Sequence, residues 1–210
     1  ATGEILGLVG ESGSGKSMTA LACLGLVPKP GRVTGSIRLD GQEMVGAPEA
    51  AVGNMRGGVA AMIFQNPGKA LNPFFTIGQQ LIHTIAHVRR LDTATARRAA
   101  ISALADVSVP DPELVLRKYP HQVSGGQLQR IMIAMALGCK PKLLIADEPT
   151  TALDVTIQAQ ILSLIRQLQR EMHMGVIFIT HDMGVVAEVA DRVLVMYQGE
   201  QVEQGPANDI

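Results

Sequence analysis

The sequence predicts an α/β fold with a mostly parallel sheet, an inserted helical region and additional antiparallel strands. Short apolar runs typical of buried strands lie near both ends of the 210-residue chain. Between them, roughly residues 75–140 carry apolar residues at the spacing of amphipathic helices. We therefore expect one domain over residues 1–210, in which a core of residues 1–74 and 141–210 holds a helical subdomain of residues 75–140.

The individual elements follow from local patterns along the chain. Ile5 to Val9 is an unbroken apolar run that predicts the first strand, and Met18 to Leu26 predicts a buried helix. Thr34 to Leu39 predicts a strand that ends in the hairpin signal Asp40-Gly41. The other expected strands are residues 58–64, 142–146, 176–180, 192–197 and 200–203, and the other expected helices are residues 76–90, 93–107, 125–138 and 155–172.

The loop between the first strand and the first helix has the phosphate-binding sequence G-x-x-x-x-G-K-S. It consists of Gly10, Glu11, Ser12, Gly13, Ser14, Gly15, Lys16 and Ser17. Glycines let the backbone curl so that successive N–H groups point at phosphate oxygens, and the following helix adds the positive end of its dipole. We expect Lys16 to reach the β- and γ-phosphates and the Ser17 hydroxyl to bind Mg²⁺. The strand before the loop and the helix after it favour this interpretation over a chance glycine-rich turn.

A second nucleotide-binding element follows the apolar run Leu143 to Ala146. Asp147 and Glu148 come directly after this run, which predicts a buried parallel strand that delivers a carboxylate at its C-terminal end. Asp147 can hold Mg²⁺ through water, and Glu148 can act as general base for a water molecule that attacks a γ-phosphate. The alternative is a strand that ends in two solvated acids, and the phosphate-binding loop upstream makes it the weaker interpretation.

Composition argues against several other classes of protein. The formal net charge is -1, so no basic field favours a nucleic-acid partner. No apolar run approaches the ~20 residues of a membrane-spanning helix, and no basic signal segment precedes the first strand. Cys23 and Cys139 lie in apolar helical segments and are expected to be reduced core residues. His83 and His87 have zinc-compatible spacing on one helix, but without a third ligand nearby we expect no metal site there.

Further stretches complete a set that resembles the ATP-binding cassette (ABC) transporter family. Gln65 resembles the family's Q-loop, Ser124-Gly125-Gly126-Gln127 its signature, and His181 its switch histidine. Asp147-Glu148 resembles its Walker B end, and Ala152-Leu153-Asp154 its D-loop. The resemblance covers essentially the whole chain and implies a P-loop NTPase (RecA-like) core whose helical subdomain carries the signature. It also implies that ATP and Mg²⁺ are bound and that ATP is hydrolysed. Val123 stands where the family usually has Leu, which exchanges one apolar residue for another.

The signature lies at the start of an expected helix, where exposed N–H groups and the helix dipole form a second anion site. An ordinary Ser-Gly helix cap is the alternative. The resemblance implies that Ser124, Gly125, Gly126 and Gln127 close on the ATP of a partner cassette.

The resemblance also assigns roles near the γ-phosphate. Gln65 would contact Mg²⁺ or the attacking water and report to the transport partner. His181, which could otherwise be a strand-end core histidine, would hydrogen-bond the γ-phosphate. The expected catalytic residues are therefore Glu148, His181 and Gln65, and the expected Mg²⁺ residues are Ser17, Gln65 and Asp147.

Within the family, the chain is most similar to the ATP-binding subunits of bacterial dipeptide, oligopeptide and nickel importers. The similarity lies in residues 63–67, 71–78 and 151–158. It implies a second ATPase subunit, identical or different, transmembrane permease subunits and, indirectly, an external solute-binding protein. The chain would then lie on the cytoplasmic face of the inner membrane. The apolar segment Leu71 to Ile77 is a candidate docking surface for the membrane partner, although Phe74 and Phe75 could instead pack inside the helical subdomain.

Two further expectations concern the ends of the chain and other functions. Family members place an adenine-stacking aromatic residue upstream of the phosphate-binding loop, and many peptide-importer cassettes continue beyond the strand near Glu203, so we expect this chain to be a fragment. A non-transport ABC ATPase acting on ribosomes or DNA is one alternative, but such proteins usually carry two cassettes or a coiled-coil insertion. A nucleotide-sensing module without turnover is another, against which Lys16, Asp147, Glu148 and His181 argue.

Overall fold

A six-stranded sheet forms the centre of the computed structural model, which describes residues 3–150 and 154–209. The strand order is β4-β5-β6-β1-β7-β8, and neighbouring strands are parallel except for β7 and β8. The strands are β1 (Ile5–Gly10), β4 (Ala60–Ile63), β5 (Leu143–Asp147), β6 (Gly175–Thr180), β7 (Arg192–Tyr197) and β8 (Glu200–Pro206). A separate antiparallel pair is formed by β2 (Arg38–Leu39) and β3 (Gln42–Glu43). The expected α/β fold with a mostly parallel sheet is confirmed.

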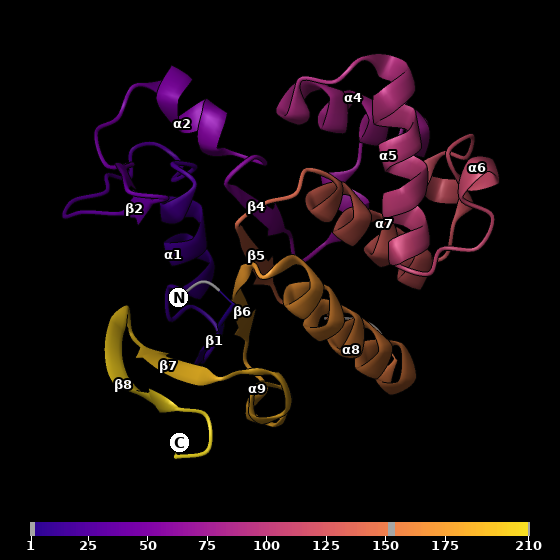
Figure 1. Cartoon of the computed structure of the whole chain (residues 1–210). Helices are drawn as coiled ribbons and strands as arrows, with labels where there is room; N and C mark the ends of the chain where they lie inside the picture. The colour runs from indigo at the N-terminus through magenta and orange to yellow at the C-terminus, as the bar shows by residue number, and fades with distance from the viewer. Residues whose placement is uncertain (1–2, 151–153, 210) are drawn as a thin grey trace.

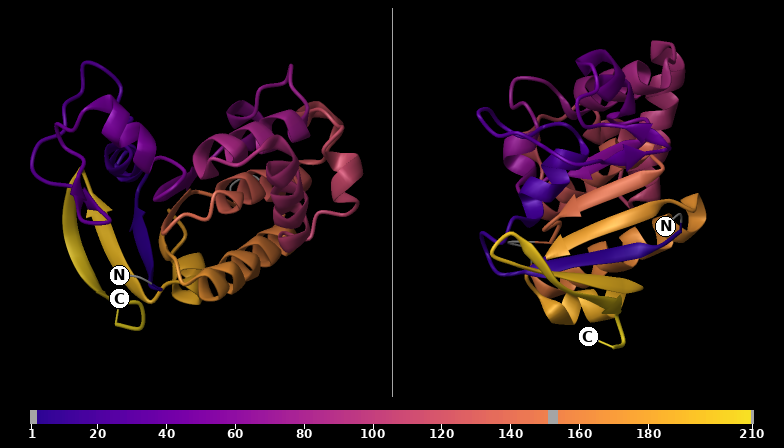
Figure 2. Two further views of the ribbon diagram at one scale, coloured as in Figure 1. Left: turned by 45° about the horizontal axis from the view of Figure 1, so that its top comes forward. Right: turned by 90° about the vertical axis from the view of Figure 1, so that its left-hand side faces the viewer.

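Helices lie on both sides of this sheet (Figure 1). The segments before and after the middle of the chain form α1 (Lys16–Cys23), α2 (Glu49–Met55), α8 (Val155–Met172) and α9 (Met183–Val189). The middle of the chain forms α3 (Pro67–Ala70), α4 (Ile77–Arg89), α5 (Thr93–Asp106), α6 (Pro112–Val115), the 3-10 turn η1 (Pro120–Gln122) and α7 (Gly125–Gly138). In Figures 1 and 2, α4, α5 and α7 lie together on one side of the sheet, while α2 and the β2–β3 pair lie on the other.

Side chains of the buried strands alternate between two apolar clusters, as the two-residue period of a strand requires. Ile145 of β5 and Ile179 of β6 belong to a cluster that includes Ala20 of α1 and Val52 of α2. Leu144 and Phe178, on the same two strands, belong to the cluster that contains α4, α5, α7 and α8. The sheet is therefore covered by helices on both faces.

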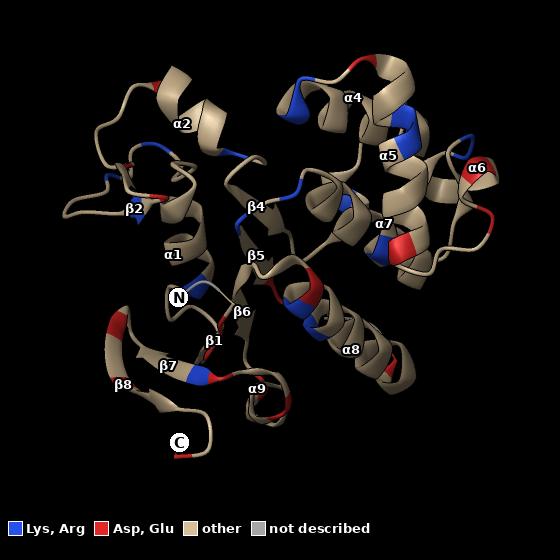
Figure 3. Ribbon diagram, viewed as in Figure 1, with Lys and Arg blue, Asp and Glu red and all other residues tan. Residues whose placement is uncertain are grey.

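Helix starts follow the capping residues that the sequence offers. The Asp154 side chain accepts a hydrogen bond from the Ile157 N–H at the start of α8, at 2.9 Å, and Asp92 does the same for Thr95 in α5. Thr76 and Gln79 form a reciprocal capping box at the start of α4. Within the described residues, no helix is long and apolar enough to cross a membrane. Acidic and basic residues are interspersed over the ribbon (Figure 3).

Two elements differ from the sequence-based expectation for physical reasons. The expected strand Thr34 to Leu39 pairs only at its last two residues, and just before them the Ile37 N–H donates to the Glu43 carboxylate at 2.9 Å. The first helix begins at Lys16 rather than Met18 and ends at Cys23 rather than Leu26. It ends there because Gly25 adopts a φ of +62° and donates to the Ala22 carbonyl, which closes the last turn. The short helices α2 and α9 were not predicted.

Candidate functional site

The loop between β1 and α1 is shaped by three glycines with positive φ. Gly10, Gly13 and Gly15 have φ values of +152°, +83° and +97°, a region that side chains other than hydrogen rarely allow. At Gly10 space is also restricted, because a Cβ atom there would lie 2.1 Å from the Met196 carbonyl oxygen. Gly15 is the N-cap of α1, so the loop leads directly into the positive end of a helix dipole.

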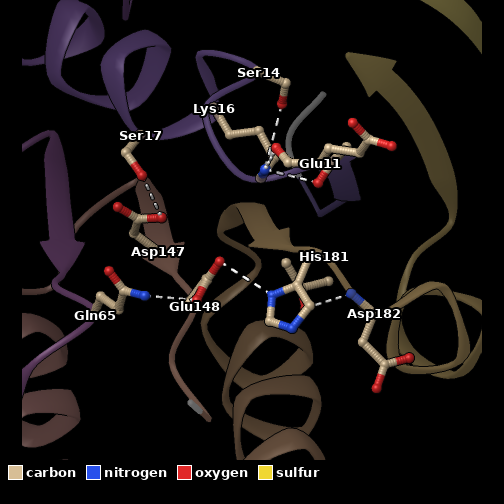
Figure 4. A network of polar contacts seen from close by, with 11 residues as sticks. Glu11, Ser14, Lys16, Ser17, Gln65, Asp147, Glu148, His181 and Asp182 are labelled. Atoms are coloured by element: carbon tan, nitrogen blue, oxygen red, sulfur yellow. Dashed lines mark hydrogen bonds and ion pairs between the residues drawn. The ribbon is translucent and has the colours of Figure 1, made fainter. Parts of the chain in front are cut away.

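Lys16 is buried at the first position of α1, with 6% of its surface exposed. Its ammonium donates hydrogen bonds to the carbonyl oxygens of Gly10 at 2.8 Å and Glu11 at 2.7 Å, and to Ser14 Oγ at 3.3 Å. Figure 4 shows the lysine lying along the inside of the loop. A positive charge is thus fixed beside the backbone that the sequence assigned to phosphate binding.

Ser17 and Asp147 bring α1 and β5 together below the loop. The Ser17 hydroxyl donates to Asp147 Oδ1 at 3.1 Å, and Asp147 is the buried last residue of β5. Burial raises the pKa of Asp147 above its ordinary value, and the Ser17 hydrogen bond acts in the opposite direction. A hydroxyl and a buried carboxylate are hard oxygen donors of the kind Mg²⁺ prefers. A divalent cation would also offset the cost of burying the charge, so these residues fit Mg²⁺.

Glu148 is held between two residues that come from the ends of neighbouring strands. Gln65 Nε2 donates to Glu148 Oε2 at 2.7 Å, and His181 Nδ1 lies 3.2 Å from Glu148 Oε1 (Figure 4). The Glu148 side chain is 17% exposed, whereas that of His181 is 63% exposed. Glu148 itself has a φ of +45°, an uncommon conformation for a residue with a Cβ. The backbone therefore turns at Glu148 and directs its carboxylate away from the line of β5.

These residues meet the phosphate-binding loop in one cavity of about 640 Å³. Its lining includes Gly10 to Ser12, Gln65, Glu148 and His181. Gln65 is joined to Glu148 by a hydrogen bond, while the described contacts of Asp147 include Ser17 but not Gln65. The cavity can place an anion beside the loop and a water molecule beside the Glu148 carboxylate.

Sequence reasoning did not identify several residues near this cavity. Val9, Met183 and Val195 form apolar parts of its lining. Asp182 caps α9 by accepting from Gly184 N at 2.8 Å and Val185 N at 3.3 Å, which fixes the loop that carries His181. An aspartate followed by apolar residues at helical spacing is a capping signal that could have identified this helix.

The signature residues lie apart from the phosphate-binding loop. Ser124 and Gln127 form a capping box at the start of α7, with two hydrogen bonds of 3.3 Å. Ser124 and Gly125 are exposed, and a Cβ atom on Gly125 would meet open space. None of the hydrogen bonds given for the described residues joins residues 124–127 to residues 10–17. Asp154 caps α8, while Ala152 and Leu153 lie outside the described residues.

The segment Leu71 to Ile77 presents its two phenylalanines differently from its aliphatic residues. Leu71 and Ile77 are buried, but Phe74 is 84% exposed and Phe75 is half-exposed. The interpretation that Phe74 packs inside the helical subdomain is therefore wrong. Phe75 lines a cavity of about 1090 Å³ between α4, α5 and α6, whose edge also carries Arg97 and Glu113.

The histidines of α4, His83 and His87, and the two cysteines show no catalytic geometry. The rings of His83 and His87 stack in parallel with centroids 6.4 Å apart. In the described ranges, no group of three or more His, Cys, Asp or Glu side chains is arranged to hold a metal ion. Both cysteines are free, and burial raises the pKa of Cys139 to about 11 and also raises the pKa of Cys23.

Comparison with known proteins shows which family this chain resembles in sequence and in fold. Residues 1–151 match the family model described as ABC transporter. The chain is 57% identical to the glutathione import ATP-binding protein GsiA of Pectobacterium atrosepticum, over 99% of this chain and 34% of that protein. It is 49% identical to the oligopeptide transport ATP-binding protein OppD of Salmonella typhimurium, over 99% of this chain and 62% of that protein. The chain thus spans about a third and about three fifths of these curated relatives.

Solved structures give the same grouping. A dimeric, post-hydrolysis structure of the ATP-binding cassette MJ0796 bound to ADP and Pi matches with a TM-score of 0.84 and 26% identity, over 99% of this chain and 87% of that one. The structure of cbiO1 from Clostridium perfringens, part of the ABC transporter complex cbiONQ, matches with a TM-score of 0.84 and 29% identity. That match covers 99% of this chain and 79% of the other.

Proposed function

This chain belongs to the ABC transporter family, and we propose that it is an ATP-binding and ATP-hydrolysing domain that energises a membrane importer. The observation that carries the proposal is the Glu148 carboxylate, which is held between Gln65 and His181 in a cavity that residues 10–12 of the phosphate-binding loop also line. A general base needs to be held within reach of its water and oriented by neighbours. A module that only sensed nucleotide would have no use for such a base.

ATP binds through the loop of residues 10–17. The backbone N–H groups of the loop and of the start of α1 donate hydrogen bonds to the phosphate oxygens. Lys16 exchanges its contacts with loop carbonyls for contacts with the β- and γ-phosphates. Ser17 and Asp147 would hold Mg²⁺, which when bound neutralises phosphate charge and orients the phosphate oxygens. The buried Asp147 carboxylate supports this assignment.

Hydrolysis then depends on Glu148. Its carboxylate accepts a proton from water while the water oxygen attacks the γ-phosphorus, and the bond to the β–γ bridging oxygen breaks to give ADP and phosphate. Gln65 donates to one carboxylate oxygen and His181 lies against the other, so both residues orient the base. The exposed side of His181 is free to hydrogen-bond the γ-phosphate.

The site is completed by a second cassette. Ser124 and Gly125 are exposed at the start of α7 and Gly126 is partly exposed, and we infer that this helix start closes on ATP held by a partner subunit. The dimeric state of the cassette MJ0796, with 26% identity, supports this arrangement. The partner can be an identical or a different ATPase subunit.

We infer from these relatives that the transported solute is a peptide; nickel or a related small solute, which the sequence resemblance also implied, is the alternative. The names of GsiA and OppD refer to glutathione import and oligopeptide transport. Transmembrane permease subunits and, indirectly, an external solute-binding protein would then be the partners, with the chain on the cytoplasmic face of the inner membrane. The exposed Phe74 and the cavity beside Phe75 support the segment of residues 71–77 as the docking surface.

Phosphate release by the full-length protein with its membrane partners tests this function. We expect ATP-dependent phosphate release that falls about 10²–10⁴-fold in Glu148→Gln, because the amide cannot accept the proton. ATP binding should persist in this variant, since the amide keeps the shape of the carboxylate. ATP binding by the wild type without any phosphate release would instead establish a nucleotide-sensing module without turnover.

A further inference from the structure

The carbonyl groups of the phosphate-binding loop need hydrogen-bond donors that the protein itself supplies. A loop that turns its N–H groups toward a phosphate must turn its carbonyl groups away, and each buried carbonyl needs a hydrogen-bond partner. The Thr19 N–H donates to the Gly15 carbonyl at 2.9 Å. Lys16 Nζ donates to the carbonyls of Gly10 and Glu11, although it exchanges these contacts for phosphate contacts when ATP binds. The Ser14 carbonyl accepts from the Gly199 N–H at 3.2 Å. That donor lies far from the loop in sequence, in the turn between β7 and β8.

The β7–β8 turn has a backbone geometry that leaves the Gly199 N–H available. Gln198 and Gly199 have φ values of +47° and +87°, and Tyr197 pairs directly with Glu200. Two central residues with positive φ define the tight type I′ hairpin turn. In such a turn the hydrogen bond between the strands uses the N–H of the residue after Gly199, so the Gly199 N–H points out of the hairpin and reaches Ser14.

Met196, the residue before this turn, contacts the loop at two more places. Its carbonyl oxygen occupies the space that a Cβ on Gly10 would need, at 2.1 Å, and its Cε lies 3.4 Å from the position of a Cβ on Gly15. The pairing of β7 with β8 shifts register between Val195 and Met196. Met196 also pairs directly with Gly10 in the parallel ladder of β1 and β7, so the strand that leads into the turn is already fixed beside the start of the loop.

We propose that the β7–β8 turn, through Gly199, positions the phosphate-binding loop and thereby sets its affinity for nucleotide. Gly199 is a positioning residue, because it acts on the ligand through Ser14 and does not touch it. The proposal rests on the nucleotide binding assigned above. It predicts that strain in this turn weakens ATP binding, whereas equal strain in a turn elsewhere does not.

The chain contains a matched control turn at Asp40-Gly41. Asp40 and Gly41 have φ values of +50° and +79°, and a Cβ on either Gly41 or Gly199 would meet nothing within 4 Å. Gly199→Val and Gly41→Val therefore introduce similar backbone strain without a steric clash. Gly199→Asn is the conservative variant, because asparagine tolerates positive φ.

Calorimetric titration of full-length protein with ATP and Mg²⁺, together with thermal melts, compares these variants. We expect Gly199→Val to bind ATP about 3- to 10-fold more weakly, the range that one neutral hydrogen bond supports. Gly41→Val and Gly199→Asn should stay within about 2-fold of the wild type, and both valine variants should melt lower by similar amounts.

The outcomes separate this inference from the proposed function. If the wild type binds ATP, and Gly199→Val and Gly41→Val bind it with equal affinity, the inference is overturned and the proposed function stands. A wild type that binds no nucleotide would overturn both. Should Gly199→Val fail to fold, hydrogen exchange of the wild type decides: the Gly199 amide should be protected and become more protected with ATP. Exchange of this amide at the unprotected rate would overturn the inference.

Discussion

Replacing Lys16 with alanine removes the fixed positive charge of the phosphate-binding loop. Lys16 is buried and donates to Gly10, Glu11 and Ser14, so its ammonium is already oriented where phosphate oxygens would lie. A hydrogen bond to a charged group contributes about 1.5–3 kcal/mol. Lys16→Ala should therefore raise the Kd for ATP about 10- to 150-fold. Calorimetric titration measures this change, at a temperature at which a melt shows the variant to be folded.

Lys142 provides the matched control for this variant. It is an exposed lysine whose ammonium pairs with Asp40 at 2.7 Å, away from the loop. An exposed ion pair of this kind contributes about 0–1 kcal/mol, so Lys142→Ala should leave ATP affinity unchanged and the melt nearly so. An unchanged Kd in folded Lys16→Ala would refute the assignment of Lys16 to the phosphates.

Three further predictions follow from packing, burial and exposure. Gly10→Ala should destabilise the fold by about 2 kcal/mol or more in chemical denaturation, because its Cβ would overlap the Met196 carbonyl; Gly13→Ala, with positive φ but open space, should cost only about 1 kcal/mol. Asp147→Asn should raise the melting temperature of the ligand-free protein at pH 7, because burial raises the pKa of Asp147 and disfavours its charged form in the fold. That gain should disappear below about pH 4, where the Asp147 carboxyl is protonated in the unfolded state as well as in the fold. A difference in melting temperature between Asp147→Asn and the wild type that is the same at pH 3 and pH 7 would contradict this reasoning. Phe74→Asp should leave the melt unchanged, because the side chain is 84% exposed, but should reduce co-purification of permease subunits, and full retention would argue against this docking surface.

Local patterns were sufficient for the elements whose physics is local. The buried strands and the long helix α8 have unambiguous apolar runs or helical spacing. The motif of the phosphate-binding loop consists of consecutive residues, so it can be recognised locally. The strand expected at Thr34 to Leu39 was mostly wrong: only its last two residues pair, and the Ile37 N–H is bound by the Glu43 side chain. The helices α2 and α9 have only seven residues each, too few for a clear period.

The geometry of the candidate site depends on contacts that no local pattern specifies. Gln65 and Glu148 are 83 residues apart, and Glu148 and His181 are 33 residues apart. They meet because β4, β5 and β6 are adjacent parallel strands whose carboxyl ends lie at one edge. The positive φ of Glu148 and the hydrogen bond from Gly199 to Ser14 likewise arise from tertiary packing. The sequence therefore indicated the candidate residues, and the strand order determined how they contact one another.

The central claim is that Glu148 of one chain and the signature of another act on the same ATP. Size-exclusion chromatography with light scattering tests it on full-length Glu148→Gln, with the partner cassette included if the pair is heteromeric. We predict a dimer that forms only with ATP and Mg²⁺, because unhydrolysed γ-phosphate bridges both halves. Adding Gly125→Asp should abolish this dimer while ATP still binds the monomer, since Gly125 is exposed and surrounded by open space and the new carboxylate would repel the phosphate. An ATP-dependent dimer that survives Gly125→Asp would contradict the composite site.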